Sequence, residues 1–513
     1  MRVEDFLRTS ARRLPDKEAL TAGGRRFAYG ELDRLSDRLA AALAARGFRR
    51  GERVVLFMDN AWETVVSIFA VLKAGGVFCP VNPSTKAAKL AFILTDSEAA
   101  AILTLARLAP VAAEAMAGAP SVRFALAAGG STAGFDDFEA AIADAPLGPL
   151  AFAGIEIDLA MLVYTSGSTG FPKGVMMTHQ NVDAAATSIT TYLENTEADV
   201  ILNVLPVSFD YGLYQVLMAM KVGARLVLEK SFAFPRAVLD KAIAERVTGL
   251  PLVPTMASLI LQMKDIAPGQ FPDLRYVTNT AAALPPAHIR ALRDLFAGAT
   301  LYSMYGLTEC KRCTYLPPAE LDRRPGSVGV AIPGTEAFVV GEDGKEVPRG
   351  ETGELVIRGP HVMKGYWRNE AATAKALRQG PFPWEKVLYT GDLFRRDAEG
   401  FLYFVARKDD IIKTRGEKVS PKEVENVIYT IPGVREVAVV GVPDEVLGLA
   451  LKAVVAIDPG VQLEARDIVR ACASQLEDFM VPKHVEFRAA LPKTDTGKVS
   501  RRLVAAGAEG DDA

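Results

Sequence analysis

The segment from Val54 to Cys79 constrains the fold most strongly, because it has the pattern of a strand, a helix and a second strand. It runs VVLFM, then AWETVVSIFAVLKA, then a Gly-Gly turn and VFC. Unbroken apolar strands that are joined by a helix occur in parallel sheets covered on both faces. Similar apolar stretches recur at 100–105 and 225–229 between helical patterns. The sequence therefore predicts an α/β fold with several αβ layers.

The pattern changes beyond Arg324, where short alternating strands are separated by turn signals such as Asp343-Gly344. This part is predicted to be a β-rich subdomain. A densely charged stretch then precedes further strand-like segments and a helical pattern, which together are typical of a small α+β domain. We expect residues 1–408 to form a large N-terminal domain and residues 409–513 to form a small, mobile C-terminal domain.

The overall charge excludes some classes of partner. Lys and Arg number 59 and Asp and Glu number 62, so the net charge is −3. No global field of this chain would attract nucleic acid or anionic lipid. The longest uncharged run, 247–263, contains prolines and is shorter than a membrane span requires. We therefore expect no nucleic-acid partner and no membrane span.

Cysteine usage indicates a reducing compartment. The chain has 4 cysteines, too few for a disulfide framework in 513 residues, and its N-terminus has no secretory signal pattern. We expect a cytoplasmic protein. Cys310 and Cys313 have the spacing of metal ligands, but no second pair of cysteines or histidines accompanies them. We assign them to packing rather than to a zinc site.

The most informative motif is the run from Tyr164 to Gly174, which is rich in glycine and hydroxyl residues and directly follows an apolar strand. Such a run lets backbone N–H groups and hydroxyls converge on an anion, and Lys173 adds a positive charge. It does not match the P-loop pattern G-x-x-x-x-G-K-[ST], because Pro172 stands five positions after Gly167. The run predicts a phosphate-binding loop of another kind.

This loop, TSGSTGFPKG, resembles the phosphate loop of the adenylate-forming ligases. That superfamily contains acyl-CoA synthetases, carrier-protein adenylation domains and luciferases. Further matching motifs cover essentially the whole chain in the family's order and spacing: YGLTE at 305–309, YTGD at 389–392, RKDDIIK at 407–413 with Gly416, and PKTDTGK at 492–498. The chain is identified as a member of this superfamily on these residues.

The resemblance implies how the nucleotide is held. A carboxylate is a poor electrophile, so the family joins one of its oxygens to the α-phosphorus of ATP to make AMP a leaving group, and cations and oriented dipoles stabilise the crowded negative charge. The residues expected to hold the β and γ phosphates of ATP are Thr165, Ser166, Gly167, Ser168, Thr169, Gly170 and Lys173.

The resemblance also implies a role for each residue of the next two motifs. Tyr305 would stack on adenine, and Thr308 would contact the α-phosphate. Glu309 would bind Mg²⁺, a hard cation that prefers oxygen ligands. Asp392 would accept hydrogen bonds from the ribose hydroxyls, and Arg407 would donate to ribose and phosphate.

The C-terminal motifs imply a second use of the same site. In the family, the residue that matches Lys498 bridges the substrate carboxylate and the α-phosphate during adenylation. The C-terminal domain then turns about a hinge at the position of Asp409 for thioester formation. By resemblance, Gly416 would line the tunnel for the pantetheine thiol, with Lys413 near it.

The acyl pocket is ambiguous in the sequence. Phe209 stands where many acyl-CoA synthetases have a histidine, and Asp210 follows it. Phe-Asp is similar to amino-acid-activating domains, in which the aspartate binds the substrate ammonium. Asp210 also precedes a helical pattern, where aspartate is a favoured N-cap. Both interpretations stay open.

Other residues expected in the pocket favour a small or aromatic acid over a long fatty chain. Tyr211 and Tyr214 are bulky, and Ala281 and Ala282 replace glycines of the family's pattern. Aromatic residues at such spacing are also common in ordinary cores. The sequence does not identify the acid or the oligomeric state.

We therefore expect an ATP- and Mg²⁺-dependent carboxylic acid–CoA ligase that proceeds through an acyl-adenylate and releases AMP and pyrophosphate. The alternative is a stand-alone adenylation enzyme that loads an amino, β-amino or other acid onto the phosphopantetheine arm of a separate carrier protein. A non-catalytic nucleotide-binding regulator is disfavoured, because Glu309 and Lys498 are retained.

Overall fold

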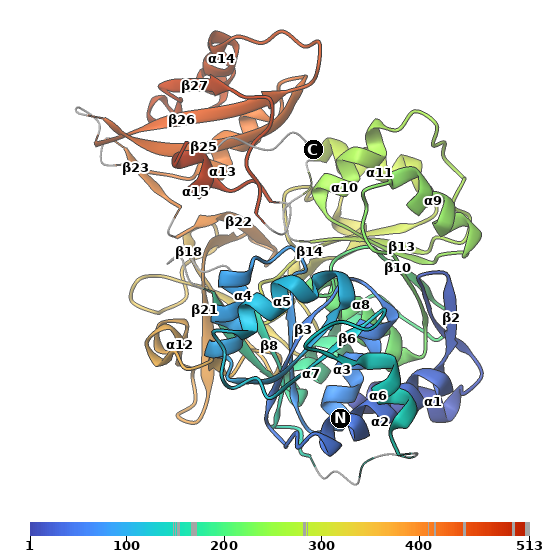
Figure 1. The fold of residues 1–513 in the computed structure, drawn as a ribbon. Helices are drawn as coiled ribbons and strands as arrows, with labels where there is room; N and C mark the ends of the chain where they lie inside the picture. Colours follow the sequence, from blue (N-terminus) through green and yellow to red (C-terminus); the bar gives the residue numbers. More distant parts are fainter. Residues whose placement is uncertain are drawn as a thin grey trace.

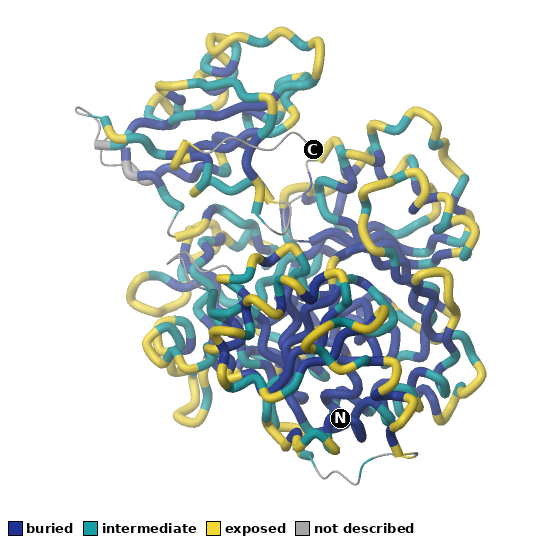
Figure 2. Tube along the Cα trace, viewed as in Figure 1, coloured by how far each residue is buried: buried dark blue, intermediate teal, exposed yellow. Residues whose placement is uncertain are grey.

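The computed structural model places a large body of sheets and helices beside a smaller C-terminal body (Figure 1). It describes residues 1–146, 148, 150, 154–165, 172–280, 284, 286–408, 410–414, 417–444, 448–494 and 498–507. The large body has a buried centre of strands and helices, and exposed residues lie mostly on its loops and outer helices (Figure 2). This arrangement confirms the predicted fold class.

One sheet contains the predicted strand–helix–strand unit. Its order is β19-β9-β8-β4-β3-β5-β6-β7. Its strands are β3 (Arg53–Phe57), β4 (Val77–Val81), β5 (Ala99–Leu105), β6 (Phe124–Ala128), β7 (Asp136–Asp137), β8 (Leu159–Thr165), β9 (Lys173–Thr178) and β19 (Gly365–Tyr366). Strands β3 and β4 are parallel and fully in register, with α3 (Trp62–Lys73) between them in the chain. The predicted unit is therefore confirmed.

The second large sheet has the order β16-β15-β14-β13-β12-β10-β11-β1-β2. Its strands are β1 (Glu18–Ala22), β2 (Arg25–Ala28), β10 (Val200–Asn203), β11 (Arg225–Leu228), β12 (Gly249–Leu252), β13 (Tyr276–Asn279), β14 (Thr300–Tyr305), β15 (Thr314–Leu316) and β16 (Val330–Ala331). One apolar core joins this sheet to the first, because α3 is buried along nearly its whole length between them.

The helices cover both sheets and fill the space between them. Those of the large body are α1 (Glu4–Arg13), α2 (Tyr29–Ala45), α4 (Ala87–Asp96), α5 (Ala109–Met116), α6 (Phe138–Asp144), α7 (His179–Tyr192), α8 (Asp210–Val222), α9 (Pro235–Ala244), α10 (Pro254–Gln262), α11 (Pro286–Leu295) and α12 (Glu370–Ala376). Helices α4 and α5 pack on the first sheet through a separate apolar cluster. Within the described ranges, no helix is both long and apolar enough to cross a lipid bilayer.

A third, antiparallel sheet corresponds to the predicted β-rich subdomain. Its strands are β17 (Glu336–Val340), β18 (Thr352–Arg358), β20 (Leu377–Gln379), β21 (Lys386–Arg396) and β22 (Leu402–Arg407). Strand β21 pairs with β18, β20 and β22, so it lies at the centre of this sheet. The chain leaves the large body after β22.

The C-terminal elements form sheets and apolar clusters of their own. They are β23 (Ile412–Thr414), β24 (Glu417–Val419), α13 (Pro421–Ile428), β25 (Val434–Asp444), β26 (Gly448–Ile457), α14 (Ala465–Gln475), β27 (His484–Phe487) and α15 (Arg501–Ala505). The order β25-β26-β27 forms one sheet, with α13 and α14 on an apolar cluster distinct from that of the large body. In Figure 1 this part lies at one end of the molecule, next to β22. The α+β prediction is confirmed.

The four cysteines are buried and form no disulfide in the described part of the chain: Cys79, Cys310, Cys313 and Cys472. Cys310 Sγ and Cys313 Sγ lie 3.0 Å apart within the turn that follows β14. Among the described residues, no group of three or more His, Cys, Asp or Glu residues could hold a metal ion. The two cysteines pack inside this turn.

Helix α8 docks closely onto the loop before it through a glycine. A Cβ on Gly212 would lie 2.3 Å from the carbonyl oxygen of Pro206 and 2.5 Å from that of Leu205. The side chain of Asn203 donates to the Gly212 carbonyl at 3.2 Å. These contacts fix the position of the first turn of α8, which carries Asp210.

We predict that Gly212→Ala lowers the free energy of unfolding by about 1–3 kcal/mol, because the added methyl group forces backbone atoms apart. Thermal unfolding monitored by circular dichroism measures the effect. Gly326→Ala is the matched control, since a Cβ there meets nothing within 4 Å. Equal unfolding temperatures for the two variants would contradict this account of the contact.

Candidate active site

The predicted phosphate loop lies between paired strands. Thr165 is the last residue of β8 and Lys173 is the first of β9, and the two are antiparallel Cα partners. Both side chains are half-buried. The other loop residues of the prediction lie outside the described residues: Ser166, Gly167, Ser168, Thr169 and Gly170.

Tyr305, Asp392 and Arg407 meet although they are far apart in the sequence. Tyr305 ends β14, and its hydroxyl donates to Asp392 Oδ2 at 2.5 Å. Arg407 pairs with Asp392 across β21 and β22, and its Nε lies 3.6 Å from Asp392 Oδ1. The Tyr305 ring contacts Phe394 edge to face, with centroids 5.0 Å apart. The contact joins the second large sheet to the β-rich sheet.

The environment of Asp392 raises the pKa of its carboxyl above the ordinary value. Burial is the largest cause, and the charges of Glu309 and Asp410 act in the same direction. The Arg407 charge and the Tyr305 hydrogen bond oppose the rise. Asp392 therefore holds a negative charge with difficulty, which donors such as ribose hydroxyls would stabilise.

Glu309 is held by a tyrosine that the sequence analysis missed. The hydroxyl of Tyr366, in β19, donates to Glu309 Oε1 at 2.7 Å. Lys173 Nζ lies 5.3 Å from the centroid of the Tyr366 ring. Burial raises the pKa of Tyr366, so it stays a donor. Tyr366 thus links the strand after the phosphate loop to the half-buried Thr308-Glu309 pair.

These groups fit a Mg²⁺ ion that accompanies ATP. Glu309 Oε1 accepts from Tyr366, and Oε2 has no hydrogen-bond partner among the described residues. A hard cation takes carboxylate and phosphate oxygens and is commonly held by one or two carboxylates plus substrate phosphates. Lys173 lies over the ring of Tyr366, the residue that donates to Glu309. A phosphate chain bound beside Glu309 would need this further positive charge.

Lys498 reaches this site from the C-terminal body. It is accessible to solvent, and its backbone N–H donates to Thr494 Oγ1 at 3.3 Å. Desolvation by surrounding protein and the Arg407 charge lower its pKa, while the charges of Asp210 and Asp392 oppose this. Lys498 therefore lies close enough to interact electrostatically with the predicted ribose site and with the predicted acyl pocket.

Asp210 is not the N-cap of its helix, so that interpretation is wrong. The N-cap of α8 is Phe209, and Asp210 is the first helical residue. The Asp210 carboxylate faces a cation, since Lys311 Nζ lies 3.6 Å from its Oδ2. Lys311 also donates to the Asp210 carbonyl at 2.6 Å. The sequence analysis missed Lys311 because it treated the residues between Cys310 and Cys313 only as a spacer.

The remaining pocket residues divide into described and undescribed ones. Phe209 is partly buried and packs on the main core. Tyr214 is fully buried, and its hydroxyl has no hydrogen-bond partner among the described residues. The predicted residues that lie outside the described residues are Ala281, Ala282, Asp409 and Gly416, and the side chain of Lys413 in β23 does too.

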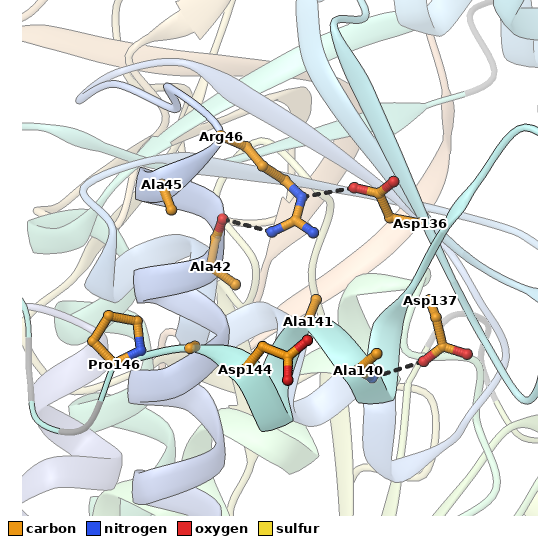
Figure 3. Close-up of a pocket in the computed structure, with 10 residues that line it drawn as sticks. Ala42, Ala45, Arg46, Asp136, Asp137, Ala140, Ala141, Asp144 and Pro146 are labelled. Carbon is orange, nitrogen blue, oxygen red and sulfur yellow. Dashed lines mark hydrogen bonds and ion pairs between the residues drawn. The ribbon is translucent and has the colours of Figure 1, made fainter.

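A pocket elsewhere in the large body does not coincide with these groups. It lies between α2 and α6, and Arg46 donates there to Asp136 at 2.8 Å and to the Ala42 carbonyl at 3.0 Å (Figure 3). Asp137 caps α6 by accepting from the Ala140 N–H. Its polar side chains serve local contacts, and no motif residue lines it.

Comparison with known proteins gives two family matches. Residues 7–367 match the family model described as AMP-binding enzyme, and residues 423–498 match the AMP-binding enzyme C-terminal domain. The chain is 31% identical to a long-chain-fatty-acid–CoA ligase of Bacillus subtilis, covering 98% of this chain and 93% of that protein. It is 34% identical to a feruloyl-CoA synthase of Amycolatopsis sp, covering 95% of each.

Solved structures agree with these matches. An ATP-bound MatB from Rhodopseudomonas palustris superposes with a TM-score of 0.89 at 31% identity, covering 99% of both chains. The anthranilate CoA ligase AuaEII in complex with anthranoyl-AMP gives a TM-score of 0.91 at 27% identity, covering 99% of this chain and 97% of that one.

The fold, the site and these matches define an AMP-forming ligase of acids and thiols. The chain belongs to the AMP-binding enzyme family, within the adenylate-forming superfamily. It is an ATP-dependent acid–CoA ligase, with CoA as a co-substrate.

We predict that nucleotide affinity falls on acidification more steeply for the wild type than for Asp392→Asn. The raised pKa means that Asp392 protonates at a higher pH than an ordinary aspartate, and protonation removes an acceptor for ribose hydroxyls. Calorimetric titration with AMP from pH 7.5 to 5 measures this. Comparing the two profiles cancels the titration of the nucleotide phosphate, and parallel profiles would contradict the role of Asp392.

We predict that Tyr366→Phe raises the Mg²⁺ concentration required for half-maximal activity and lowers kcat/KM by about 5- to 10-fold. Because Glu309 is half-buried and water can replace part of the bond, its loss should cost about 1–1.5 kcal/mol, at or below the range for hydrogen bonds to charged groups. Steady-state rates over a Mg²⁺ series measure both effects. Tyr403→Phe is the control, because its hydroxyl contacts Asp397. An unchanged Mg²⁺ dependence in Tyr366→Phe would contradict the proposed support of Glu309.

Proposed function

We propose that this ligase adenylates a small carboxylic acid at the site that Glu309, Asp392 and Lys498 surround, and then transfers the acyl group to CoA at the same site. The observation that carries the proposal is the position of Lys498. This lysine belongs to the C-terminal body and interacts electrostatically with Asp210, Asp392 and Arg407 of the large body. Such an arrangement suits adenylation, in which one cation must serve both acid and nucleotide.

In the first step, a carboxylate oxygen attacks the α-phosphorus of ATP and the bond to the β-phosphate breaks, so pyrophosphate leaves. Asp392 accepts from the ribose hydroxyls, and Arg407 donates to ribose and phosphate. Tyr305 stacks against adenine, and Thr308 contacts the α-phosphate. Lys498 donates to the substrate carboxylate and the α-phosphate, since a flexible ammonium can follow charge as it moves.

The remaining charge falls on the phosphate chain. Thr165 and Lys173, together with the predicted loop residues between them, hold the β and γ phosphates. Glu309 would hold Mg²⁺, which supplies positive charge that neutralises the phosphate oxygens. Tyr366 keeps the Glu309 carboxylate oriented by donating to Oε1.

In the second step, the thiol sulfur of CoA attacks the acyl carbon, AMP departs and the thioester forms. We propose that residues 409–513 rotate against residues 1–408 between the two steps, with Asp409 as the hinge. The separate apolar clusters of the C-terminal elements support such rotation, because a part with its own core can move as a unit. Lys413 and Gly416 would then lie beside the pantetheine arm.

The proposed small size of the acid rests on α8. Tyr211 and Tyr214 are fully buried on this helix, and the Tyr211 hydroxyl is held by Thr278 at 2.6 Å. These side chains occupy volume that a long acyl chain would need. Relatives with very different acids, from fatty acids to ferulic acid, share this family, so the pocket lining rather than the fold selects the acid.

The purified chain, incubated with ATP, Mg²⁺, a panel of small acids and free CoA, should release AMP and form an acyl-CoA. Chromatography with mass detection measures both products. A parallel reaction with a purified carrier protein in its phosphopantetheine form tests the other acceptor. If a thioester forms on the carrier protein and no acyl-CoA forms, the protein is a stand-alone adenylation enzyme and not a CoA ligase.

We predict that Lys498→Ala lowers acid-dependent ATP–pyrophosphate exchange by at least about 100-fold, as is typical when a preorganised cation is removed from a transition state. Thioester formation from a supplied acyl-adenylate should stay within a few-fold of the wild type. Lys493→Ala is the control, because this nearby lysine pairs with Glu436. Equal loss of both half-reactions in Lys498→Ala would contradict the assigned role.

A further inference from the structure

A buried lysine beside two residues of the predicted acyl pocket, Asp210 and Tyr214, has no explanation in the nucleotide chemistry. Lys311 follows Glu309 by two positions, and its residue is only 2% exposed. Its Nζ contacts the Asp210 carbonyl, lies 3.6 Å from Asp210 Oδ2 and lies 4.5 Å from the centroid of the Tyr214 ring. Burial of a cation is strongly unfavourable unless other groups compensate for the lost water.

The buried lysine lies in a tight and strained turn. Lys311 has a φ of +64°, which non-glycine residues rarely adopt. Gly306 makes the turn possible, because a Cβ there would lie 2.1 Å from the Lys311 carbonyl oxygen. The contact between Cys310 and Cys313 lies inside the same turn. Strain of this kind persists where the surrounding structure holds it, and it is concentrated at functional positions.

The groups around Lys311 lack acceptors rather than donors. The hydroxyl of Tyr214 has no hydrogen-bond partner among the described residues, and neither has Nε of the buried Arg312. An ammonium carries three N–H groups and a guanidinium five, and neither can accept a hydrogen bond. An oxygen acceptor would suit all three groups, because the Tyr214 hydroxyl can donate as well as accept.

The excess of positive charge around Lys311 also favours an oxygen acceptor as the ligand. Asp210 is the carboxylate that faces Lys311, and it also interacts with Lys498. Arg312 adds another positive charge against the Tyr211 ring, 5.0 Å from its centroid. A substrate ammonium would be repelled by these cations, and the Asp210 carboxylate that could attract it already interacts with Lys311 and Lys498. This counts against the amino-acid interpretation of Asp210.

We propose that Lys311 and Tyr214 form the far end of the acyl pocket and bind an oxygen acceptor on the substrate, so that the enzyme selects short acids with a second carboxylate or another acceptor group. This inference rests on the proposed function. In the proposed function the reacting carboxylate binds Lys498, which interacts electrostatically with Asp210, and Asp210 in turn faces Lys311 at 3.6 Å. We therefore expect an acid with acceptor groups at both ends to engage Lys498 and Lys311 together.

Matched acids test the proposal in the full-length enzyme with ATP, Mg²⁺ and CoA. Each pair has equal chain length: succinate with butyrate and glutarate with valerate. Two further acids of the same length vary the end group. Succinate carries an anionic acceptor, 4-hydroxybutyrate a neutral acceptor and 4-aminobutyrate an amine. We expect kcat/KM at least 10-fold higher for a dicarboxylate or hydroxy acid than for its plain partner, with the amine the poorest.

The variants assign this preference to the two side chains. Lys311→Met should abolish the preference mainly through KM for the acceptor acids, while KM for butyrate, which has no second acceptor, should change several-fold less. Tyr214→Phe should reduce the preference several-fold. Lys241→Met is the control, because this partly exposed lysine of α9 pairs with Glu229. If Lys311→Met alone does not fold, Lys311→Met with Asp210→Asn keeps the pair neutral and carries the same expectation.

The outcomes separate this inference from the function beneath it. Acyl-CoA formation without preference for acceptor acids, or a preference that survives in the Lys311 variants, overturns the inference and leaves the ligase intact. Preference for 4-aminobutyrate overturns it in favour of amine recognition by Asp210. Absence of AMP release with every acid, under conditions where the protein is folded and binds ATP, overturns the proposed function and the inference together.

Discussion

The contact of Tyr305, Asp392 and Arg407 is the interaction on which the site depends. It joins the end of β14 in the second large sheet to paired residues of β21 and β22. A buried carboxylate needs donors and cations around it, and here they come from separate sheets. The proposed nucleotide site thus forms only when both sheets are assembled, and Lys498 of the C-terminal body interacts electrostatically with Asp392 and Arg407.

The sequence predicted those parts of the site that reside in local motifs. The motifs predicted the strand before the phosphate loop and four site residues: Tyr305, Glu309, Asp392 and Arg407. In the structure Tyr305 and Arg407 both contact Asp392. The βαβ unit at β3 and β4 was predictable because apolar runs and turn residues specify it locally. Their assigned roles in catalysis stay predictions.

Residues whose positions depend on tertiary pairing were missed. Tyr366 reaches Glu309 only because β19 pairs with β9, from a segment nearly 200 positions along the chain. Lys311 is buried in a turn with a positive φ, and no hydrophobic pattern reveals either feature. The N-cap interpretation of Asp210 failed for a related reason: the helix begins one residue earlier than the pattern favours, so the carboxylate meets Lys311 instead.

The separate core of the C-terminal elements has a consequence for local unfolding. Its strands β25 and β26 bury their apolar faces against α13, α14 and α15 rather than against the large body. Amide hydrogens in this part can therefore exchange with solvent through opening of this unit alone, while the central sheets stay protected. A nucleotide that engages Lys498 would slow that exchange, so ligand binding could be followed by the protection of amides far from the ligand.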